Sequence, residues 1–105
     1  MRFEVVINER AGTLVGGDVD AVAATVTKVL EERGHTVECT VIHPAKLSGA
    51  VKLALGQKPD VLVVGGGDGT IRSATEAALG TGIPLGVLPL GTVNRLARDL
   101  GMPFD

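Results

Sequence analysis

The sequence has 105 residues, 45% of them hydrophobic, which is enough for one small domain with a modest core. Its only aromatic residues are Phe3 and Phe104, so the core must be aliphatic, and platforms for stacking nucleic-acid bases are missing. Ten basic residues stand against twelve acidic ones and give a formal net charge of −2. A chain without a basic excess is not expected to bind DNA or RNA.

The single cysteine, Cys39, excludes an internal disulfide and a CxxC metal site, which fits a reducing compartment. Residues 1–17 lack the basic start and long apolar run of a secretory signal, and no apolar stretch approaches the length of a membrane span. These features predict a soluble, cytoplasmic domain.

Strand and helix patterns alternate along the whole sequence. Residues 2–8 are rich in β-branched side chains, and residues 60–64 are apolar on both faces, as in a central parallel strand. Apolar residues recur with a helical period between Asp18, a plausible N-cap, and Gly34, a stop signal. The same patterns predict further strands at residues 35–43 and 83–89. They predict further helices at about 70–79, at about 92–100, and where apolar residues form a stripe at positions 47, 50, 51, 54 and 55.

This alternation predicts an α/β fold: a three-layer α/β/α Rossmann-like domain with a parallel sheet of about four strands and right-handed crossovers. Ligands of such sheets bind beyond the carboxyl ends of the strands. Three glycine-containing loops fall at that edge, at residues 8–12, 65–70 and 89–92. The sequence stops after a helix terminator without a polar tail, which suggests a piece of a longer protein, although a compact four-strand domain would look the same.

The second loop, "GGGDGT" at residues 65–70, contains four glycines in its first five positions. A strand-to-helix turn often uses one or two glycines for backbone geometry or close packing, and this is the structural alternative. Four glycines raise the entropy cost of folding beyond what a turn requires. A ligand that touches bare backbone N–H groups explains them better, and phosphate at a helix N-terminus is the usual case.

The charges near two expected helix starts favour the same ligand. Acidic residues normally occupy the first turn of a helix, because its N-terminus carries a partial positive charge. The helix expected at Thr70 has Arg72 early and no carboxylate until Glu76, and the one expected at Thr92 has Arg95 and Arg98 before Asp99. An external anion would offset both departures. The alternative is that the arginines are solvated and point away.

Two common phosphate-binding motifs are excluded. The Walker pattern GxxxxGK[ST] does not occur. The dinucleotide pattern GxGxxG fits Gly65 and Gly67 but has Thr70 in place of its third glycine. The ribose-binding acid expected about 20 residues further on is also absent, so a NAD-binding Rossmann domain is not expected.

The segment "GGDGT" (66–70), followed by "GVLPLGTVNRLARDLGMP" (86–103), resembles the nucleotide-binding half of the diacylglycerol kinase catalytic domain family, which includes bacterial lipid kinases and sphingosine kinases. GGDGT alone is less specific, because NAD kinases carry it and phosphofructokinases carry a close variant. The second segment distinguishes between these families, because it resembles lipid kinases and not NAD kinases. The resemblance covers essentially the whole chain, from the first strand onward.

The resemblance implies a set of site residues. In this family the turn after the first strand approaches the nucleotide, and here it would run from Asn8 to Gly12. Asp68 would hold Mg²⁺, directly or through water, or orient the acceptor hydroxyl. Its structural alternative is a turn or capping role. The residues that the resemblance expects to line ATP are Asn8, Gly12, Gly66, Gly67, Asp68, Gly69, Thr70, Gly91, Thr92 and Asn94. The charges at the two helix starts, and not the resemblance, make Arg72 and Arg95 the expected phosphate-side cations.

Several positions depart from the family pattern. Glu9 replaces a proline and would place a negative charge near the phosphate site. Arg72 and Ser73 follow GGDGT where the family commonly has Asn and Glu, and Arg95 follows Asn94 where Asp is common. The threonine that family members often carry near the end of the second strand could be Thr40.

Two other residue types could suggest a site. His43 closes the second strand at the ligand-binding edge and His35 opens it, but surface or strand-end placement is the expectation for both. Cys39 is expected to be a small apolar residue inside that strand.

The resemblance also implies that residues 1–105 form the ATP-binding N-terminal domain of a lipid kinase, with ATP and Mg²⁺ as cofactors. Family enzymes add a β-rich C-terminal domain, absent from this chain, that supplies the base and much of the lipid site. We therefore expect little activity from this chain alone, and a transient membrane contact made by the missing half. The alternatives are a NAD kinase or phosphofructokinase-like phosphotransferase, and a non-catalytic nucleotide-binding module; a homodimer is also left open.

Overall fold

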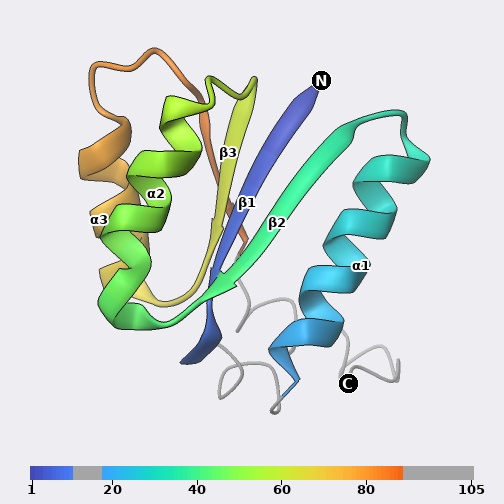
Figure 1. The fold of residues 1–105 in the computed structure, drawn as a ribbon, viewed down its shortest axis with the longest axis horizontal. Coiled ribbons are helices and arrows are strands. Elements are labelled where there is room, and N and C mark those ends of the chain that lie inside the picture. Colours follow the sequence, from blue (N-terminus) through green and yellow to red (C-terminus); the bar gives the residue numbers. More distant parts are fainter. Residues whose placement is uncertain (11–17, 89–105) are drawn as a thin grey trace.

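The computed structural model describes residues 1–10 and 18–88 of the chain (Figure 1). Strands and helices alternate along it, as the sequence predicts. A short 3₁₀ turn, η2 (Pro44–Lys46), precedes the second helix. In chain order the elements are β1 (Arg2–Asn8), α1 (Val19–Glu32), β2 (Thr36–Ile42), η2, α2 (Leu47–Gly56), β3 (Val61–Gly65), α3 (Asp68–Ala78) and β4 (Leu85–Leu88).

The four described strands form one parallel sheet in the order β2-β1-β3-β4. β1 is central, and its Val5 pairs with Cys39 of β2 on one side and with Val63 of β3 on the other. The chain moves outward from β1 to β2 and then returns past β1 to β3, so the direction of winding reverses between β1 and β3. In open α/β sheets, ligands bind in the crevice at the carboxyl ends of the two strands that flank such a reversal.

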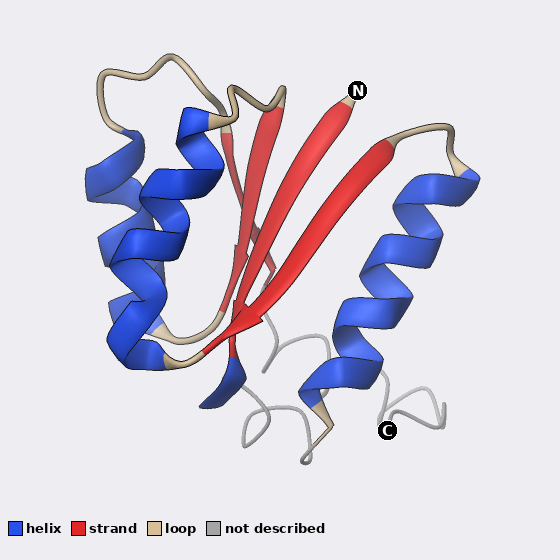
Figure 2. Cartoon of the chain, in the orientation of Figure 1, coloured by secondary structure: helices blue, strands red, loops and turns tan. Residues whose placement is uncertain are grey.

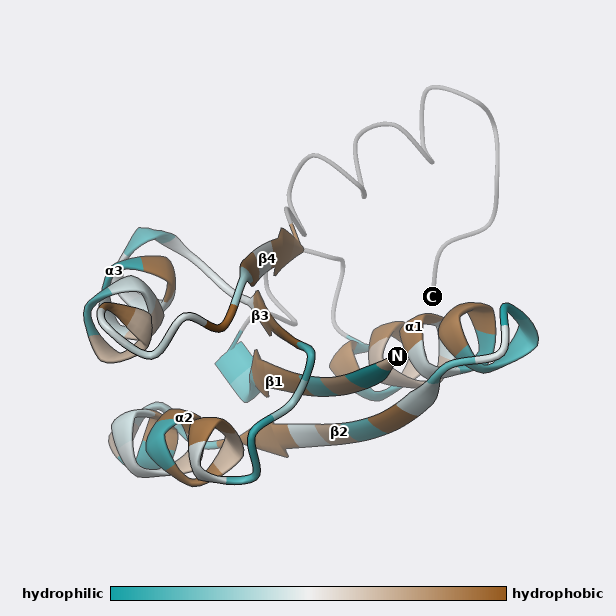
Figure 3. Ribbon diagram, turned by 90° about the horizontal axis from the view of Figure 1, so that it is seen from above, coloured by the Kyte–Doolittle hydropathy of each residue, from teal (hydrophilic) through white to brown (hydrophobic). Residues whose placement is uncertain are grey.

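Helices cover both faces of this sheet: α1 lies on one face, and α2 and α3 lie on the other (Figure 2). Consecutive residues of β1 alternate between two aliphatic clusters, because side chains of a strand point to opposite faces. Val5 and Ile7 pack with Val22 of α1, whereas Val6 packs with Val51 of α2. All three β1 residues are at most 2% exposed. Figure 3 shows the hydrophobic residues along β3 and β4. Because helices cover both faces of one parallel sheet, the predicted three-layer α/β/α fold is confirmed.

The predicted limits of α1 are confirmed at both ends. Asp18 is the N-cap, and its Oδ1 accepts a hydrogen bond from the Ala21 N–H at 3.0 Å. Gly34 follows the helix with φ +87°, a conformation that favours glycine. The predicted stripe of α2 is confirmed as well, because Leu47, Val51, Ala54 and Leu55 are all buried.

The start of α3 corrects one expectation. The helix begins at Asp68 rather than at about Thr70, with Gly67 as its N-cap residue. Asp68 therefore lies in the first turn, and the prediction that this helix lacks an early carboxylate is wrong. The reason is that β3 ends at Gly65 and a two-residue turn suffices to enter the helix, which moves the exposed Arg72 into the second turn. The charge pattern of α3 thus gives no argument for an external anion.

The helix expected at about 92–100 lies outside the described residues, as do residues 11 and 12 of the first loop. None of the helices in the described part of the chain combines the length and hydrophobicity that a bilayer crossing requires.

Candidate functional site

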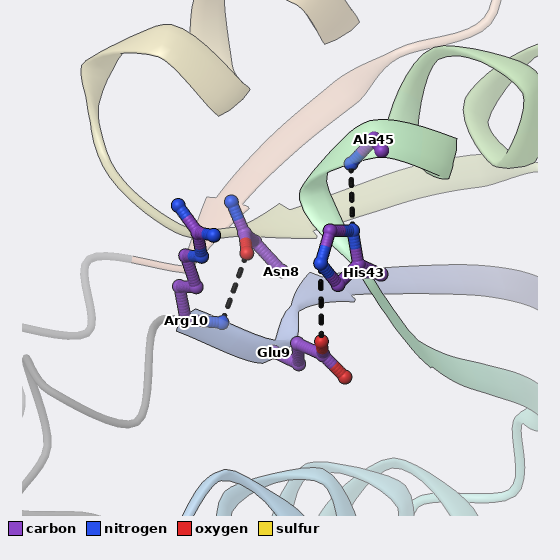
Figure 4. Close-up of polar contacts among 5 residues, drawn as sticks. All are labelled: Asn8, Glu9, Arg10, His43 and Ala45. Atoms are coloured by element: carbon purple, nitrogen blue, oxygen red, sulfur yellow. Dashed lines mark hydrogen bonds and ion pairs between the residues drawn. The ribbon is translucent and has the colours of Figure 1, made fainter.

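The carboxyl end of β1 is joined to the first turn of α3 at the point where the sheet reverses its winding. Asn8, the last residue of β1, donates a hydrogen bond from Nδ2 to Oγ1 of Thr70 at 3.1 Å. Its Oδ1 accepts a hydrogen bond from the Arg10 N–H at 2.9 Å (Figure 4). Both ends of the Asn8 amide are therefore engaged, and the side chain ties the β1 turn to the helix that follows β3.

The fold itself explains the glycine at position 66. A Cβ atom built on Gly66 would lie 2.6 Å from Oγ1 and 2.8 Å from Cβ of Thr70. Thr70 is only 5% exposed and is held by Asn8, so it has little freedom to move away. Gly66 is thus required for the close packing of the loop on the first turn of α3.

The fold does not explain the glycines at positions 67 and 69 in the same way. Both are exposed, and a Cβ atom on either would meet no described residue within 4 Å. Neither has positive φ; Gly67 is extended, at φ −89° and ψ −171°. Gly69 is also a poor helix former, although it lies in the first turn of α3. Their small size leaves the backbone of the helix start open to an approaching group.

The N-terminus of α3 presents backbone donors to that opening. The first N–H groups of a helix have no intrahelical acceptor, and here the first helical bond runs from the Ile71 N–H to the Gly67 oxygen at 3.1 Å. No side chain from residues 1–10 or 18–88 caps this end. Open amides and the partial positive charge of a helix start together favour an anion such as phosphate.

Asp68 lies in this first turn with an exposed side chain. Its carboxylate makes no hydrogen bond or ion pair with any described residue, so the capping alternative gains no support from residues 1–10 and 18–88. Within the same residues no group of three or more His, Cys, Asp or Glu side chains could hold a metal ion. Asp68 fits Mg²⁺ of the kind that keeps several waters and binds one or two carboxylates together with substrate phosphates.

The end of β2 carries a polar pair that sequence reasoning missed. Oε1 of Glu9 lies 4.0 Å from Nε2 of His43, and both side chains are about half exposed (Figure 4). Nδ1 of His43 accepts a hydrogen bond from the Ala45 N–H at 3.0 Å, which caps η2. Glu9 thus faces the end of β2, while its neighbour Asn8 faces α3. The only signal in the sequence was that both residues end adjacent parallel strands.

The structure brings Asn8, Gly66, Gly67, Asp68, Gly69 and Thr70 together at one edge of the sheet, and their role in nucleotide binding stays a prediction. Thr40 is not with them: it pairs with Val6, two residues before the end of β2, and lines a groove of about 810 Å³ between β2 and α2. Of the predicted nucleotide residues that the structure describes, none lines that groove. The remaining predicted site residues, Gly12, Gly91, Thr92, Asn94 and Arg95, lie outside the described residues.

Comparison with known proteins places these observations in a family. Residues 2–105 match the diacylglycerol kinase catalytic domain. The chain is 44% identical to a diacylglycerol kinase of Mycobacterium tuberculosis over 50 residues. These residues are 48% of this chain and 16% of that protein. It is 36% identical over 88 residues to the diacylglycerol kinase of Bacillus subtilis, covering 78% of this chain and 28% of that protein.

A third relative is a probable lipid kinase YegS-like protein of Pseudomonas aeruginosa, 49% identical over 57 residues, which are 52% of this chain and 19% of that protein. The chain therefore spans less than a third of the length of the relatives it matches. The match to the family model covers residues 2–105, nearly the whole of this chain. The chain belongs to the diacylglycerol kinase catalytic domain family.

Proposed function

We propose that this chain is the ATP-binding part of a lipid kinase that transfers the γ-phosphoryl group of ATP to a lipid hydroxyl. The observation that carries the proposal is the open start of α3. Gly67 and Gly69 are glycines that the described fold does not require, and they flank backbone N–H groups without intrahelical acceptors. Membership of the diacylglycerol kinase family supplies the reaction class.

Each residue at this edge has a distinct part in the proposal. The amides of the first turn of α3 donate to the ATP phosphates, and the small size of Gly67 and Gly69 allows the close approach. Asn8, Thr70 and Gly66 hold this turn in position and do not need to touch the nucleotide. Catalysis of phosphoryl transfer rests mainly on such positioning and on charge neutralisation.

Asp68 is the residue we propose to hold Mg²⁺, together with the phosphates and water. Bound there, the ion would neutralise charge that develops on the phosphates during transfer. Without a cation, a carboxylate in the first turn of α3 would repel the phosphates. We therefore expect ATP to bind as its Mg²⁺ complex.

The remaining parts of the proposal concern the full-length protein. The opposite wall of the nucleotide site is proposed to come from Gly91, Thr92 and Asn94, with Arg95 and Arg72 as cations near the phosphates. The lipid site and the base that deprotonates the acceptor are proposed to come from a β-rich C-terminal domain. Because the acceptor is a lipid, that domain would also contact a membrane surface from the cytoplasm.

The proposal is tested with full-length protein and radiolabelled ATP, offered diacylglycerol, a sphingoid base and NAD as separate acceptors. We expect transfer to a lipid hydroxyl. Transfer to NAD would favour a NAD kinase, and ATP binding without transfer to any acceptor would favour a non-catalytic module.

The phosphate site is tested separately by calorimetry with Mg·ATP. Gly67→Val places a branched side chain over the open amides and should lose at least about tenfold in affinity, a change of about 1.4 kcal/mol. Its melting temperature should match the parent within a few degrees, because the described residues leave that space empty. Gly56→Val at the end of α2 is the control, since Gly56 is also exposed with open space around it but lies at the opposite edge of the sheet from the α3 start. Unchanged affinity in Gly67→Val would contradict the proposal.

A further inference from the structure

The pair formed by Glu9 and His43 is the feature of the carboxyl edge that phosphate binding does not explain. A carboxylate next to a polyphosphate site is unfavourable unless something donates to it or neutralises it. His43 approaches Oε1 of Glu9 only to 4.0 Å, and the carboxylate remains about half exposed. Exposed pairs of this kind contribute little to stability.

The hydrogen bonds of His43 determine which ring nitrogen faces Glu9. Nδ1 accepts a hydrogen bond from the Ala45 N–H, so in the neutral ring Nδ1 carries the lone pair and Nε2 carries the hydrogen. Nε2 is the atom nearest to Glu9 (Figure 4). The cap on η2 thereby turns the Nε2–H toward one carboxylate oxygen, at 4.0 Å, a separation too long for a hydrogen bond, so the lone pairs of Glu9 remain available.

The position of the pair suits the sugar of a nucleotide. Glu9 follows the end of β1 and His43 follows the end of β2, so the pair lies at the carboxyl edge of the sheet, on the β2 side of β1. Neighbouring strands lie about 4.8 Å apart, so the ends of β2 and β3 are separated by about 10 Å. A nucleotide whose phosphates lie at the start of α3 can therefore cross the end of β1 and reach the pair.

A carboxylate is an acceptor-only group, so it selects a ligand that presents donors. The ribose of ATP presents two adjacent hydroxyl donors. A metal ion is the weaker candidate, because no described group of three or more metal-ligating side chains includes this pair. We infer that Glu9, with the Nε2–H of His43 facing it, accepts hydrogen bonds from the ribose hydroxyls of the bound nucleotide and makes the site selective for ribonucleotides; this inference rests on the proposed function.

The test compares four ligands on full-length protein by calorimetry: Mg·ATP, its 2′-deoxy and 3′-deoxy analogues, and inorganic tripolyphosphate. The parent should bind ATP about tenfold or more tightly than at least one deoxy analogue, as expected for a lost hydrogen bond to a charged group. Glu9→Ala should bring the affinities for ATP and the deoxy analogues within about twofold of each other. Its affinity for tripolyphosphate should stay the same or rise, because a negative charge is removed.

Two further variants separate orientation from folding. His43→Asn can still cap η2, because asparagine is a good N-cap residue, but it removes the donor that faces Glu9. It should lower the discrimination between ATP and the deoxy analogues without lowering the melting temperature. Glu32→Ala is the matched control: Glu32 is an exposed glutamate that ends α1, the helix that leads to the start of β2, and it should leave discrimination unchanged.

The outcomes distinguish this inference from the function on which it rests. The inference alone is overturned if the parent binds tripolyphosphate but binds ATP and both deoxy analogues with equal affinity. It is also overturned if Glu9→Ala still discriminates fully between ATP and the deoxy analogues. Failure of the parent to bind both ATP and tripolyphosphate overturns the phosphate site, and the inference falls with it. Loss of discrimination in Glu9→Ala with tripolyphosphate binding retained supports the inference.

Discussion

The amide of Asn8 and the hydroxyl of Thr70 lie 3.1 Å apart, although the two residues are 62 positions apart in the sequence. The bond crosses from the end of β1 to the first turn of α3, at the reversal point of the sheet. Thr70 is buried and Asn8 half-buried. This contact therefore fixes the start of α3 relative to the central strand, and the open amides of α3 with it.

Thr70→Val removes the hydroxyl while keeping the shape of the side chain. It should lower the free energy of unfolding by about 1–2 kcal/mol, because the Asn8 amide loses its acceptor in a partly buried site. Urea denaturation measures the loss, and Thr70→Ser, which keeps the hydroxyl, is the control for the bond. A double-mutant cycle with Asn8→Ala should give a coupling energy of about 0.5 kcal/mol or more, whereas additive effects would show that the two side chains do not interact.

Gly66→Ala should destabilise the protein far more than Gly67→Ala. The new Cβ would lie within 3 Å of three side-chain atoms of Thr70, and relieving this overlap must move a buried residue. We expect a loss of about 1–3 kcal/mol from overpacking at Gly66 and about zero at Gly67, where no described atom lies within 4 Å. Thermal melting of both variants checks this, and equal melting temperatures would contradict the assigned packing of Gly66.

The sequence predicted the fold well because its signals are local and agree with one another. Asp18 and Gly34 mark the ends of α1, and the stripe on α2 gives its buried face. The start of α3 was misjudged, because glycine and aspartate have low helix propensity although Gly69 and Asp68 lie in its first turn. Tertiary packing of the buried Thr70 overrides that preference.

Sequence reasoning also located one half of the candidate site but not the other. The loop at residues 65–70 could be recognised because its residues are consecutive. The pairing of Glu9 with His43 could not, since it depends on which strands are neighbours and on a cap within η2. The different roles of Gly66 and Gly67 were equally hidden, because they depend on whether Thr70 lies beneath each residue.

Glu4 gives the stability of this protein a predictable dependence on pH. It is 8% exposed on β1, and burial raises the pKa of its carboxyl above the ordinary value of 4.5; the adjacent Glu38 raises it further, and Arg2 opposes the shift. A raised folded-state pKa contributes stability that is fully present below about pH 4.5 and is lost as the pH rises through the raised pKa. Glu4→Gln should therefore be more stable than the parent at pH 7 and equal to it at pH 4.

Urea denaturation at a series of pH values between 4 and 8 checks this dependence. Glu38→Gln removes the neighbouring charge but keeps the Glu4 carboxyl, so it should shift the pH dependence in the same direction by a smaller amount. If the parent and Glu4→Gln show the same change in stability with pH, the carboxylate of Glu4 is not disfavoured in the folded state.

Arg2 holds the end of α2 to the start of the sheet. Its guanidinium donates hydrogen bonds to the backbone oxygens of Gln57 and Lys58. The backbone N–H of Arg2 donates to Oδ2 of Asp60 at 2.7 Å. Lys58 has φ +53°, a conformation rare for a residue with a side chain, so this turn depends on contacts from outside it. Arg2→Ala should therefore lower the free energy of unfolding by about 1–2 kcal/mol.

Denaturation in urea measures this loss, and two variants make the result specific. Arg2→Lys keeps the charge but loses the forked geometry that reaches two carbonyls, so it should fall between the parent and Arg2→Ala. Arg33→Ala removes an exposed arginine at the end of α1 whose side chain bonds to no described residue, and it should change stability by less than about 0.5 kcal/mol. Equal losses in Arg2→Ala and Arg33→Ala would mean that the carbonyls of Gln57 and Lys58 are satisfied by water as well as by Arg2.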